Sequence, residues 1–348
     1  MHKLTVPSAA DSYQTVQDYE SRKLLVHLLD KPQEYDKALE SHAAGVVFRI
    51  GFGRWVETGE EPEVKRIFQV NHNLERVASP GAYLVDSFPS LMVLPEIIAS
   101  FKEEGRRLHE EELSLFRKLQ DDVKRDMKNG SATRSFTRTF IENRDDYQLF
   151  DGEGAYVIGT LFEAGSGTTA AAMMSFCLAM CHCPEWQKRM QDEIDTRVGD
   201  RMPGLDDMPN LPTVRAVIKE VLRWRPVTAG GFPHQLTKDD EYNGYFFKKG
   251  TIFHPNQWAI HRDPDLYPDP DGFRPDRWLD PAFPTTFKEP LTKYPNLHNF
   301  TCFGFGRRIC PGQHIAERSL HILTARIAWA CTMSKKQDAA GNVLPLAL

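Results

Sequence analysis

The chain has 348 residues, of which 41% are hydrophobic and 26% charged, with a formal net charge of −5 and a pI near 6.2. This composition is ordinary for a globular protein, and the acidic balance argues against a nucleic-acid-binding protein, which would usually be basic. No apolar run is expected to reach the roughly 18 residues of a membrane span. The first residues, MHKLTVPSAADSYQ, lack the apolar core of a signal peptide.

The N-terminal half is predicted to be helical, because apolar residues recur there at three- and four-residue spacings. The predicted helices are 13–29, 39–50, 63–78 and 95–127. Breaker pairs such as Lys31-Pro32 and Asn129-Gly130 end them. The charged run KEEGRRLHEEE in the last of these helices interleaves both signs, which is typical of a solvated helix face rather than a binding patch.

A fifth helix is predicted over 151–183, and its sequence is apolar almost all round. A helix of this kind is expected to be buried through the middle of a protein. Polar residues such as Glu163, Ser166 and Thr168 stand at its centre, which argues against a bilayer span. Helices over 184–198 and 211–223 follow.

The pattern changes after Pro226. Residues 240–253, DEYNGYFFKKGTIF, place Asn243-Gly244 and Lys249-Gly250 between aromatic and β-branched residues, which predicts short strands and turns. Residues 261–295 are rich in proline and aspartate and are expected to be irregular, and 309–331 returns to helix. The fold class is therefore mainly α with a minor β part.

The six cysteines are too few for a disulfide framework and suit a reducing compartment. Cys181-His182-Cys183 juxtaposes possible metal ligands, but it lacks a second ligand pair at zinc spacing and ends an apolar segment. We expect this trio to be structural, because free cysteine is among the most buried residue types.

The stretch FGFGRRICPGQHIAE, residues 303–317, poses a chemical question because it contains one cysteine among glycines and arginines. A cysteine nucleophile needs a general base, and no sequence feature indicates a histidine for that role. A phosphate cradle would need a third glycine or a Lys-Ser/Thr pair, and neither is present. The remaining option is a thiolate ligand to iron, with a pKa lowered by helix N-terminal N–H groups, nearby cations and the metal.

This stretch resembles the haem-binding loop of the cytochrome P-450 family, whose pattern is F-x-x-G-x-x-x-C-x-G with a basic residue two before the cysteine. The matching positions are Phe303, Gly306, Arg308, Cys310 and Gly312. The resemblance implies that Cys310 binds the iron of haem b, that Arg308 faces a propionate and that Phe303 packs beside the sulfur.

Further motifs follow in the family's order. Glu220-Val-Leu-Arg223 resembles the E-x-x-R of the family's K helix, and Phe273-Arg-Pro-Asp-Arg277-Trp278 resembles its P-E-R-F element. The resemblance implies a buried network of Glu220, Arg223 and Arg277 under the haem loop, in which loss of one partner would cost about 3 to 5 kcal/mol. The run from Asn256 to Pro264, NQWAIHRDP, also resembles eukaryotic members.

The segment AGSGTT, residues 164–169, is similar to the family's A/G-G-x-D/E-T-T, in which an acid and the next threonine deliver protons to oxygen. Gly167 stands at the acid position, and Thr168 keeps the hydroxyl. The alternative for Thr168 is a purely structural role, in which the hydroxyl of a helix threonine bonds to its i−4 carbonyl. Alignment also nominates His234 for a propionate, and the alternative is a surface turn histidine.

The resemblance covers nearly the whole chain as one partial P-450 domain, 1–348, from the D helix through the L helix. We expect a member truncated at both ends, without the membrane anchor, the N-terminal sheet, the B helix or the C-terminal hairpin. The expected location is the cytosolic face of the endoplasmic reticulum membrane if the full-length gene carries an anchor, and the cytoplasm for this chain alone.

The leading hypothesis is a monomeric haem-thiolate monooxygenase that takes electrons from NADPH through a flavoprotein reductase and binds no nucleic acid. Its substrate would be a hydrophobic metabolite, with Val227 to Gly231 and the Ala164 region lining the pocket. The runs PGAYLVDSFPSL and YPDPDGFRPDRW resemble fungal secondary-metabolism members. One alternative is a non-catalytic remnant, motivated by Gly167 and by the expected truncation at both ends. Another is a haem-thiolate isomerase or dehydratase, which needs no proton relay.

Overall fold

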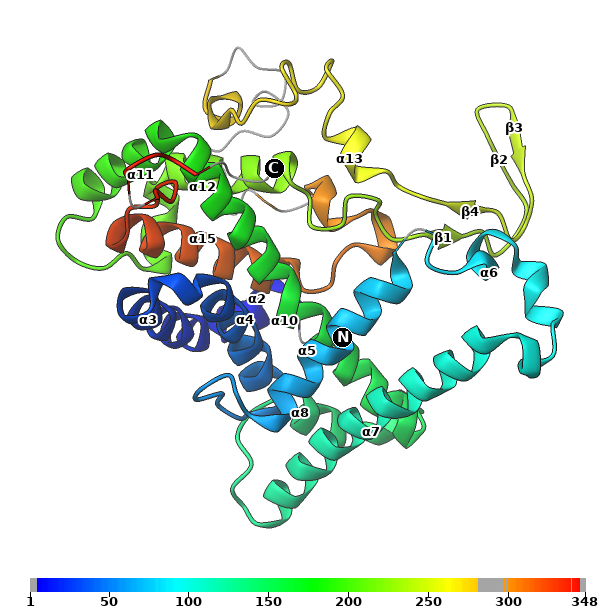
Figure 1. Ribbon diagram of the computed structural model, residues 1–348. Helices are drawn as coiled ribbons and strands as arrows, with labels where there is room; N and C mark the ends of the chain where they lie inside the picture. The colour runs from blue at the N-terminus through cyan, green and yellow to red at the C-terminus, as the bar shows by residue number, and fades with distance from the viewer. Residues whose placement is uncertain (1–4, 80, 281–296, 298–299, 339, 345–348) are drawn as a thin grey trace. The chain divides into compact units, whose positions relative to one another are not determined.

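The computed structural model describes residues 5–79, 81–280, 297, 300–338 and 340–344. The chain divides into two compact units, one built mainly from residues 11–170 and the other from 171–348 together with a short N-terminal stretch. Helix α10 (Asp151–His182) contains the boundary between them and is labelled in Figure 1. Each unit is described by itself. The expectation of a single domain over 1–348 stays a prediction.

All regular secondary structure in the described residues of the first unit is helical. Its longer helices are α3 (Gln14–Asp30), α4 (Tyr35–Phe52), α5 (Pro62–Ala78), α7 (Ser100–Lys128) and the first part of α10 (Asp151–His182). Short elements between them are η1 (Pro32–Glu34), α6 (Leu84–Ser87), η2 (Pro89–Val93), η3 (Glu96–Ile98), α8 (Phe136–Glu142) and α9 (Arg144–Tyr147). The predicted helices therefore form close to their expected bounds.

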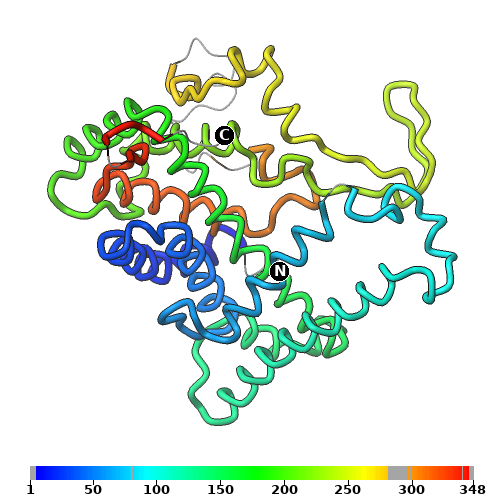
Figure 2. The backbone as a smooth tube through the Cα atoms, in the orientation of Figure 1, coloured from blue at the N-terminus to red at the C-terminus, as the bar shows by residue number. Residues whose placement is uncertain are grey.

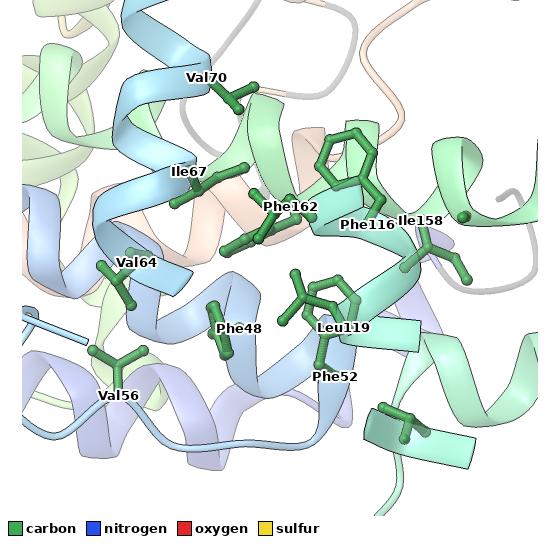
Figure 3. Close-up of a cluster of buried hydrophobic side chains, with 14 of the residues drawn as sticks. Phe48, Phe52, Val56, Val64, Ile67, Val70, Phe116, Leu119, Ile158 and Phe162 are labelled. Carbon is green, nitrogen blue, oxygen red and sulfur yellow. The ribbon is translucent and has the colours of Figure 1, made fainter. Parts of the chain in front are cut away.

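Aromatic side chains hold the core of this unit together. Figure 3 shows Phe48 and Phe52 of α4 facing Phe162 of α10, and their ring centroids lie 4.8 and 5.4 Å from that of Phe162 in edge-to-face geometry. Val64 and Ile67 of α5 close the cluster and are fully buried. Edge-to-face packing adds about 0.5 to 1.5 kcal/mol per pair to the burial itself.

Glycines let the helices of this unit approach α10 closely. A Cβ at Gly159 would lie 2.2 Å from the ring of Phe116, and one at Gly165 would lie 2.3 Å from a methyl group of Val47. Any larger residue at these two positions would therefore push α7 or α4 away from α10.

The second unit contains the described strands. Its helices are α2 (Pro7–Asp11), α11 (Pro184–Arg197), α12 (Pro212–Trp224), α13 (Gln257–Ile260) and α15 (Gln313–Ala330), with 3₁₀ turns η4 (Leu205–Asn210), η5 (Pro275–Trp278), η6 (Thr301–Phe303) and η7 (Gly306–Arg308). Proline at the first helical position starts both α11 and α12. Every residue of α12 except its first is buried, so this helix forms the centre of the unit.

The minor β part consists of two antiparallel pairs. Strand β1 (His234–Gln235) pairs with β4 (Ile252–Phe253), and β2 (Asp240–Tyr242) pairs with β3 (Tyr245–Phe247). Asn243 and Gly244 have φ of 51° and 79°, the left-handed conformation of a two-residue hairpin turn, as predicted. In Figure 2 the β2–β3 hairpin extends beyond the β1–β4 pair.

Two expectations need correction. Within the described residues, α10 is long and apolar enough to cross a membrane, with a mean hydropathy of 1.2, so the expectation that no run reaches this level was wrong. A core helix of a soluble protein passes the same test. Burial all round α10 was also wrong, because Thr160, Ala164 and Thr168, spaced four residues apart, form an exposed stripe. Residues 281–295 of the predicted irregular segment lie outside the described residues.

Candidate functional site

The cysteine loop, residues 301–312, contains η6 and η7 and leads into α15. Figure 2 traces it in orange. The backbone N–H of Cys310 donates to the carbonyl of Phe303 at 2.7 Å, which closes the loop on itself. Phe303 is half-buried, and the hydrogen bond links its backbone, rather than its ring, to the cysteine. The loop therefore presents Cys310 from a closed backbone turn at the start of a long helix.

Glycines in this loop meet two different requirements. Gly304 and Gly306 have φ of 85° and 57°, which side chains rarely adopt. A Cβ at Gly306 would meet no atom within 4 Å among the described residues, so open space lies above this turn. A Cβ at Gly312 would lie 4.0 Å from the Cys310 sulfur. The turn at Gly306 therefore has open space beside it, which would allow a flat cofactor to approach the backbone closely.

Without a metal, the surroundings of the Cys310 thiol act on its pKa in two opposite directions. Burial raises the pKa of the Cys310 thiol, and hydrogen bonds from the N–H groups of Gly312 and Gln313 oppose this rise without reversing it. A metal ion bound by this sulfur would favour the thiolate, since a coordinating thiol is deprotonated by its metal.

The basic residues expected to face propionates lie on the surface of the second unit. Arg307 and Arg308 are exposed in η7, and His234 is exposed in β1. The ring Nδ1 of His234 lies 2.8 Å from the carbonyl oxygen of Phe232, two residues earlier. This contact is typical of a turn histidine, and it leaves Nε2 of the ring for a further partner.

The predicted ion-pair network is present and completely buried. Glu220, Arg223 and Arg277 have 0% exposed surface. Arg223 donates from Nε and Nη2 to the two carboxylate oxygens of Glu220 at 2.9 and 2.8 Å, and Arg277 Nε donates at 3.1 Å. One carboxylate is thus held between two guanidinium groups, as the resemblance implied.

Two further donors to Glu220 were missed in the sequence. Trp278 donates from Nε1 at 3.0 Å, and the backbone N–H of Arg274 donates at 2.9 Å. The motif FRPDRW contained both residues, but spacing alone does not indicate which atoms of a 3₁₀ turn face a helix. The carboxylate therefore accepts five hydrogen bonds, which satisfies its lone pairs.

Thr168 lies in the first unit, on the exposed stripe of α10. Its hydroxyl donates to the carbonyl of Ala164 at 2.9 Å, which is the i−4 hydrogen bond expected for a purely structural threonine. The threonine oxygen keeps lone pairs for a water or a substrate atom, so this bond does not remove the proposed role.

The helix position that carries an acid in the family pattern has a polar neighbour. A Cβ at Gly167 would lie 3.4 Å from Nδ2 of Asn71 on α5, and this amide donates to the hydroxyl of Ser166 at 2.7 Å. Glu163 is buried, and burial, together with the charge of Glu112, raises the pKa of its carboxyl to about 7. The sequence did not indicate Asn71, since no motif includes it.

The residues of the second unit fit a haem held by one thiolate. Within the described part of the chain, no group of three or more His, Cys, Asp and Glu side chains could hold a metal ion by itself. A haem needs only one protein ligand to its iron, because the porphyrin supplies the other in-plane donors. The single thiol of the loop, that of Cys310, meets that requirement.

Comparison with known proteins agrees with this geometry. The chain is 40% identical over 348 residues to cytochrome P-450 monooxygenase 113 of Postia placenta, covering 99% of this chain and 67% of that protein. It is 35% identical to cytochrome P-450 monooxygenase psoD of Aspergillus fumigatus and 34% identical to cytochrome P-450 monooxygenase fogE of Aspergillus ruber. These two alignments each cover 97% of this chain, and 65% and 62% of the respective relative.

The chain thus spans about two thirds of the length of these relatives. A family model described as cytochrome P-450 matches residues 7–340. The mainly helical fold, the buried Glu220 network and the cysteine loop occur in the order that the resemblance predicted. The chain belongs to the cytochrome P-450 family.

Proposed function

We propose that this chain carries the haem-thiolate centre of a monooxygenase that inserts one oxygen atom from O2 into a hydrophobic small molecule. The observation that carries the proposal is the loop of Cys310, in which a half-buried cysteine follows two glycines, Gly304 and Gly306, that have left-handed conformation. Haem b, when bound, would supply activation of dioxygen, with Cys310 as the ligand that favours O–O cleavage.

The protein's own residues would bind the haem and orient it. Arg308 and His234 would hold the propionates, since a guanidinium pairs well with a carboxylate. Gly306 and Gly312 would allow close approach of the ring, and Phe303 would shape the surroundings of the sulfur. Thr168 is proposed, on the resemblance alone, as the hydroxyl that holds a proton for the reaction.

Electrons would come from NADPH through a flavoprotein reductase, and the exposed Arg307 would suit an acidic partner surface. We also propose a location at the endoplasmic reticulum membrane. The exposed apolar side chains between α6 and η3 support this, with Phe88, Val93 and Ile97 exposed by 60, 87 and 94%. The proposed substrate is a metabolite of fungal secondary metabolism.

A second candidate is a haem-thiolate isomerase or dehydratase, which needs no delivery of protons to oxygen. Gly167 favours it, because the acid of the family pattern is missing from the helix that carries Thr168. Incorporation of ¹⁸O from labelled O2 into product separates the two: a monooxygenase incorporates the label, and an isomerase or dehydratase does not.

The direct test is reconstitution of the chain with haem, followed by reduction under carbon monoxide. We expect a Soret band of the thiolate type, and we expect Cys310→Ala to abolish it. Cys302→Ala is the matched control, because Cys302 is a half-buried cysteine of the same region outside the loop turn. A spectrum that is the same with and without Cys310 would show that the proposed ligand is wrong, and a chain without haem binding would favour a non-catalytic remnant.

A further inference from the structure

A buried histidine stands between the Glu220 network and the cysteine loop. His261 directly follows α13 and has no exposed surface. Its backbone carbonyl accepts a hydrogen bond from Arg223 Nη1 at 2.9 Å, which fixes the histidine to the network. The ring of His261 contacts the first residue of η6.

The ring of His261 makes two contacts with the start of the cysteine loop. Its Nε2 lies 2.8 Å from Oγ1 of Thr301, the first residue of η6. The ring stacks on Phe300 with a centroid distance of 5.3 Å and an interplanar angle of 11°. Phe300 itself is buried and packs edge-on against Trp278, which donates to Glu220. One side chain therefore holds both the ring and the hydroxyl that begin the loop.

The tautomer of His261 follows from its partners. Nδ1 is buried and has no hydrogen-bond partner in the described structure. A buried N–H without an acceptor is costly, so the ring carries its hydrogen on Nε2 and donates to Thr301. Burial, together with the positive charges of Arg223 and Arg262, lowers the pKa of His261 to about 4, so the imidazole is neutral at physiological pH.

The order imposed at Thr301 reaches the cysteine through the backbone. Gln257 Nε2 donates to the carbonyl of Thr301 at 2.8 Å, and this carbonyl also accepts the N–H of Gly304 at 2.9 Å. Phe303, the last residue of η6, accepts the N–H of Cys310. A change in the position of η6 must therefore change the hydrogen bond at Cys310.

We propose that His261 is a positioning residue for Cys310: it donates to Thr301, stacks on Phe300 and thereby fixes η6, which holds the backbone of the cysteine. This inference rests on the proposed function in naming Cys310 as the haem ligand.

The first test needs no haem. Hydrogen exchange of the full chain should show faster exchange of the Cys310 and Gly304 amides in His261→Ala and in Thr301→Val, with protection in the middle of α15 unchanged. We expect an increase of about fivefold in each variant, the factor that corresponds to ~1 kcal/mol for one neutral hydrogen bond. Unchanged exchange at Cys310 in Thr301→Val would overturn the proposal, and this variant remains decisive if His261→Ala does not fold.

The second test uses the reconstituted protein. We expect His261→Ala and Thr301→Val to lower haem affinity by about 10- to 100-fold and to reduce the share of the thiolate-type band under carbon monoxide. His261→Gln, which can still donate to Thr301, should restore both, and the two losses should not add in the double variant. His254→Ala, at an exposed histidine of the same unit, is the control.

The outcomes separate this inference from the proposed function. If Cys310→Ala leaves the spectrum unchanged, the proposed function fails whatever the His261 variants do. If Cys310→Ala abolishes the thiolate-type band but His261→Ala lowers only the unfolding temperature, with haem affinity and band intact, His261 has only a structural role and the inference is wrong.

Discussion

Neutralising Glu220 should destabilise the second unit more than any change at an exposed charge. In Glu220→Gln, one carboxylate oxygen becomes an NH2 group, which faces an N–H donor of Arg223 together with that of Arg277 at the Oε1 position or that of Trp278 at the Oε2 position. Two guanidinium groups with 0% exposure also lose their counter-ion. Removal of one partner of a buried ion pair costs about 3 to 5 kcal/mol. This loss is a large part of the roughly 5 to 15 kcal/mol that stabilises a typical domain.

Urea denaturation, followed by the circular dichroism of the helices and by tryptophan fluorescence, measures this loss. The fluorescence reports on the network because Trp278 donates a hydrogen bond to the Glu220 carboxylate. The matched control is Asp192→Asn, which breaks an exposed i,i+4 pair with Lys188 in the same unit. We expect the control to cost no more than about 1 kcal/mol. A loss of less than about 1 kcal/mol for Glu220→Gln would refute the view that this carboxylate compensates two buried cations.

Three further predictions concern the first unit. Burial raises the pKa of the Glu20 carboxyl from 4.5 to about 7, so the protonated folded state is favoured and unfolding free energy should fall as pH rises from 4.5 to 7; Glu20→Gln should flatten this slope in pH-dependent urea titrations. Gly159→Ala should cost about 1 to 3 kcal/mol because its Cβ would meet Phe116, whereas Gly105→Ala on α7, with nothing within 4 Å, should gain up to about 1 kcal/mol in thermal unfolding. Gly167→Asp should place a carboxylate beside the Asn71 amide and shift reconstituted turnover from peroxide to product; an unchanged ratio would contradict the proposed relay.

Most helices could be predicted because apolar periodicity and breakers act locally. The bounds of α5 and α10 agree with the sequence to within one residue, and the Asn243-Gly244 turn formed as its residues require. Short α8 was missed, although Ser135 caps it by accepting the N–H of Arg138 at 3.1 Å. A helix of two turns shows too little periodicity for detection, and its stability depends on burial of Phe136 and Phe140.

The candidate site was predictable to the extent that motifs name residues. Glu220 and Arg223 meet because E-x-x-R places two side chains on one helix face. Arg277 was expected beside them only from the resemblance of FRPDRW to the family's P-E-R-F element. The raised pKa of the Cys310 thiol could not be foreseen, since desolvation depends on packing around the loop and sequence shows only the nearby arginines. The contact of His261 with Thr301 joins residues 40 positions apart, and no local pattern reports such a pair.

The two guanidinium groups of the Glu220 network have a second consequence, for the order of folding. Arg223 and Arg277 also donate to five backbone carbonyls, those of His261, Pro268, Asp269, Pro270 and Gly272. The chain from 261 to 272 has almost no regular secondary structure to hold it, so these bonds take the place of a helix or sheet ladder. We therefore expect this meander and α12 to open as one cooperative unit, and the meander to acquire its shape only once the helix is in place.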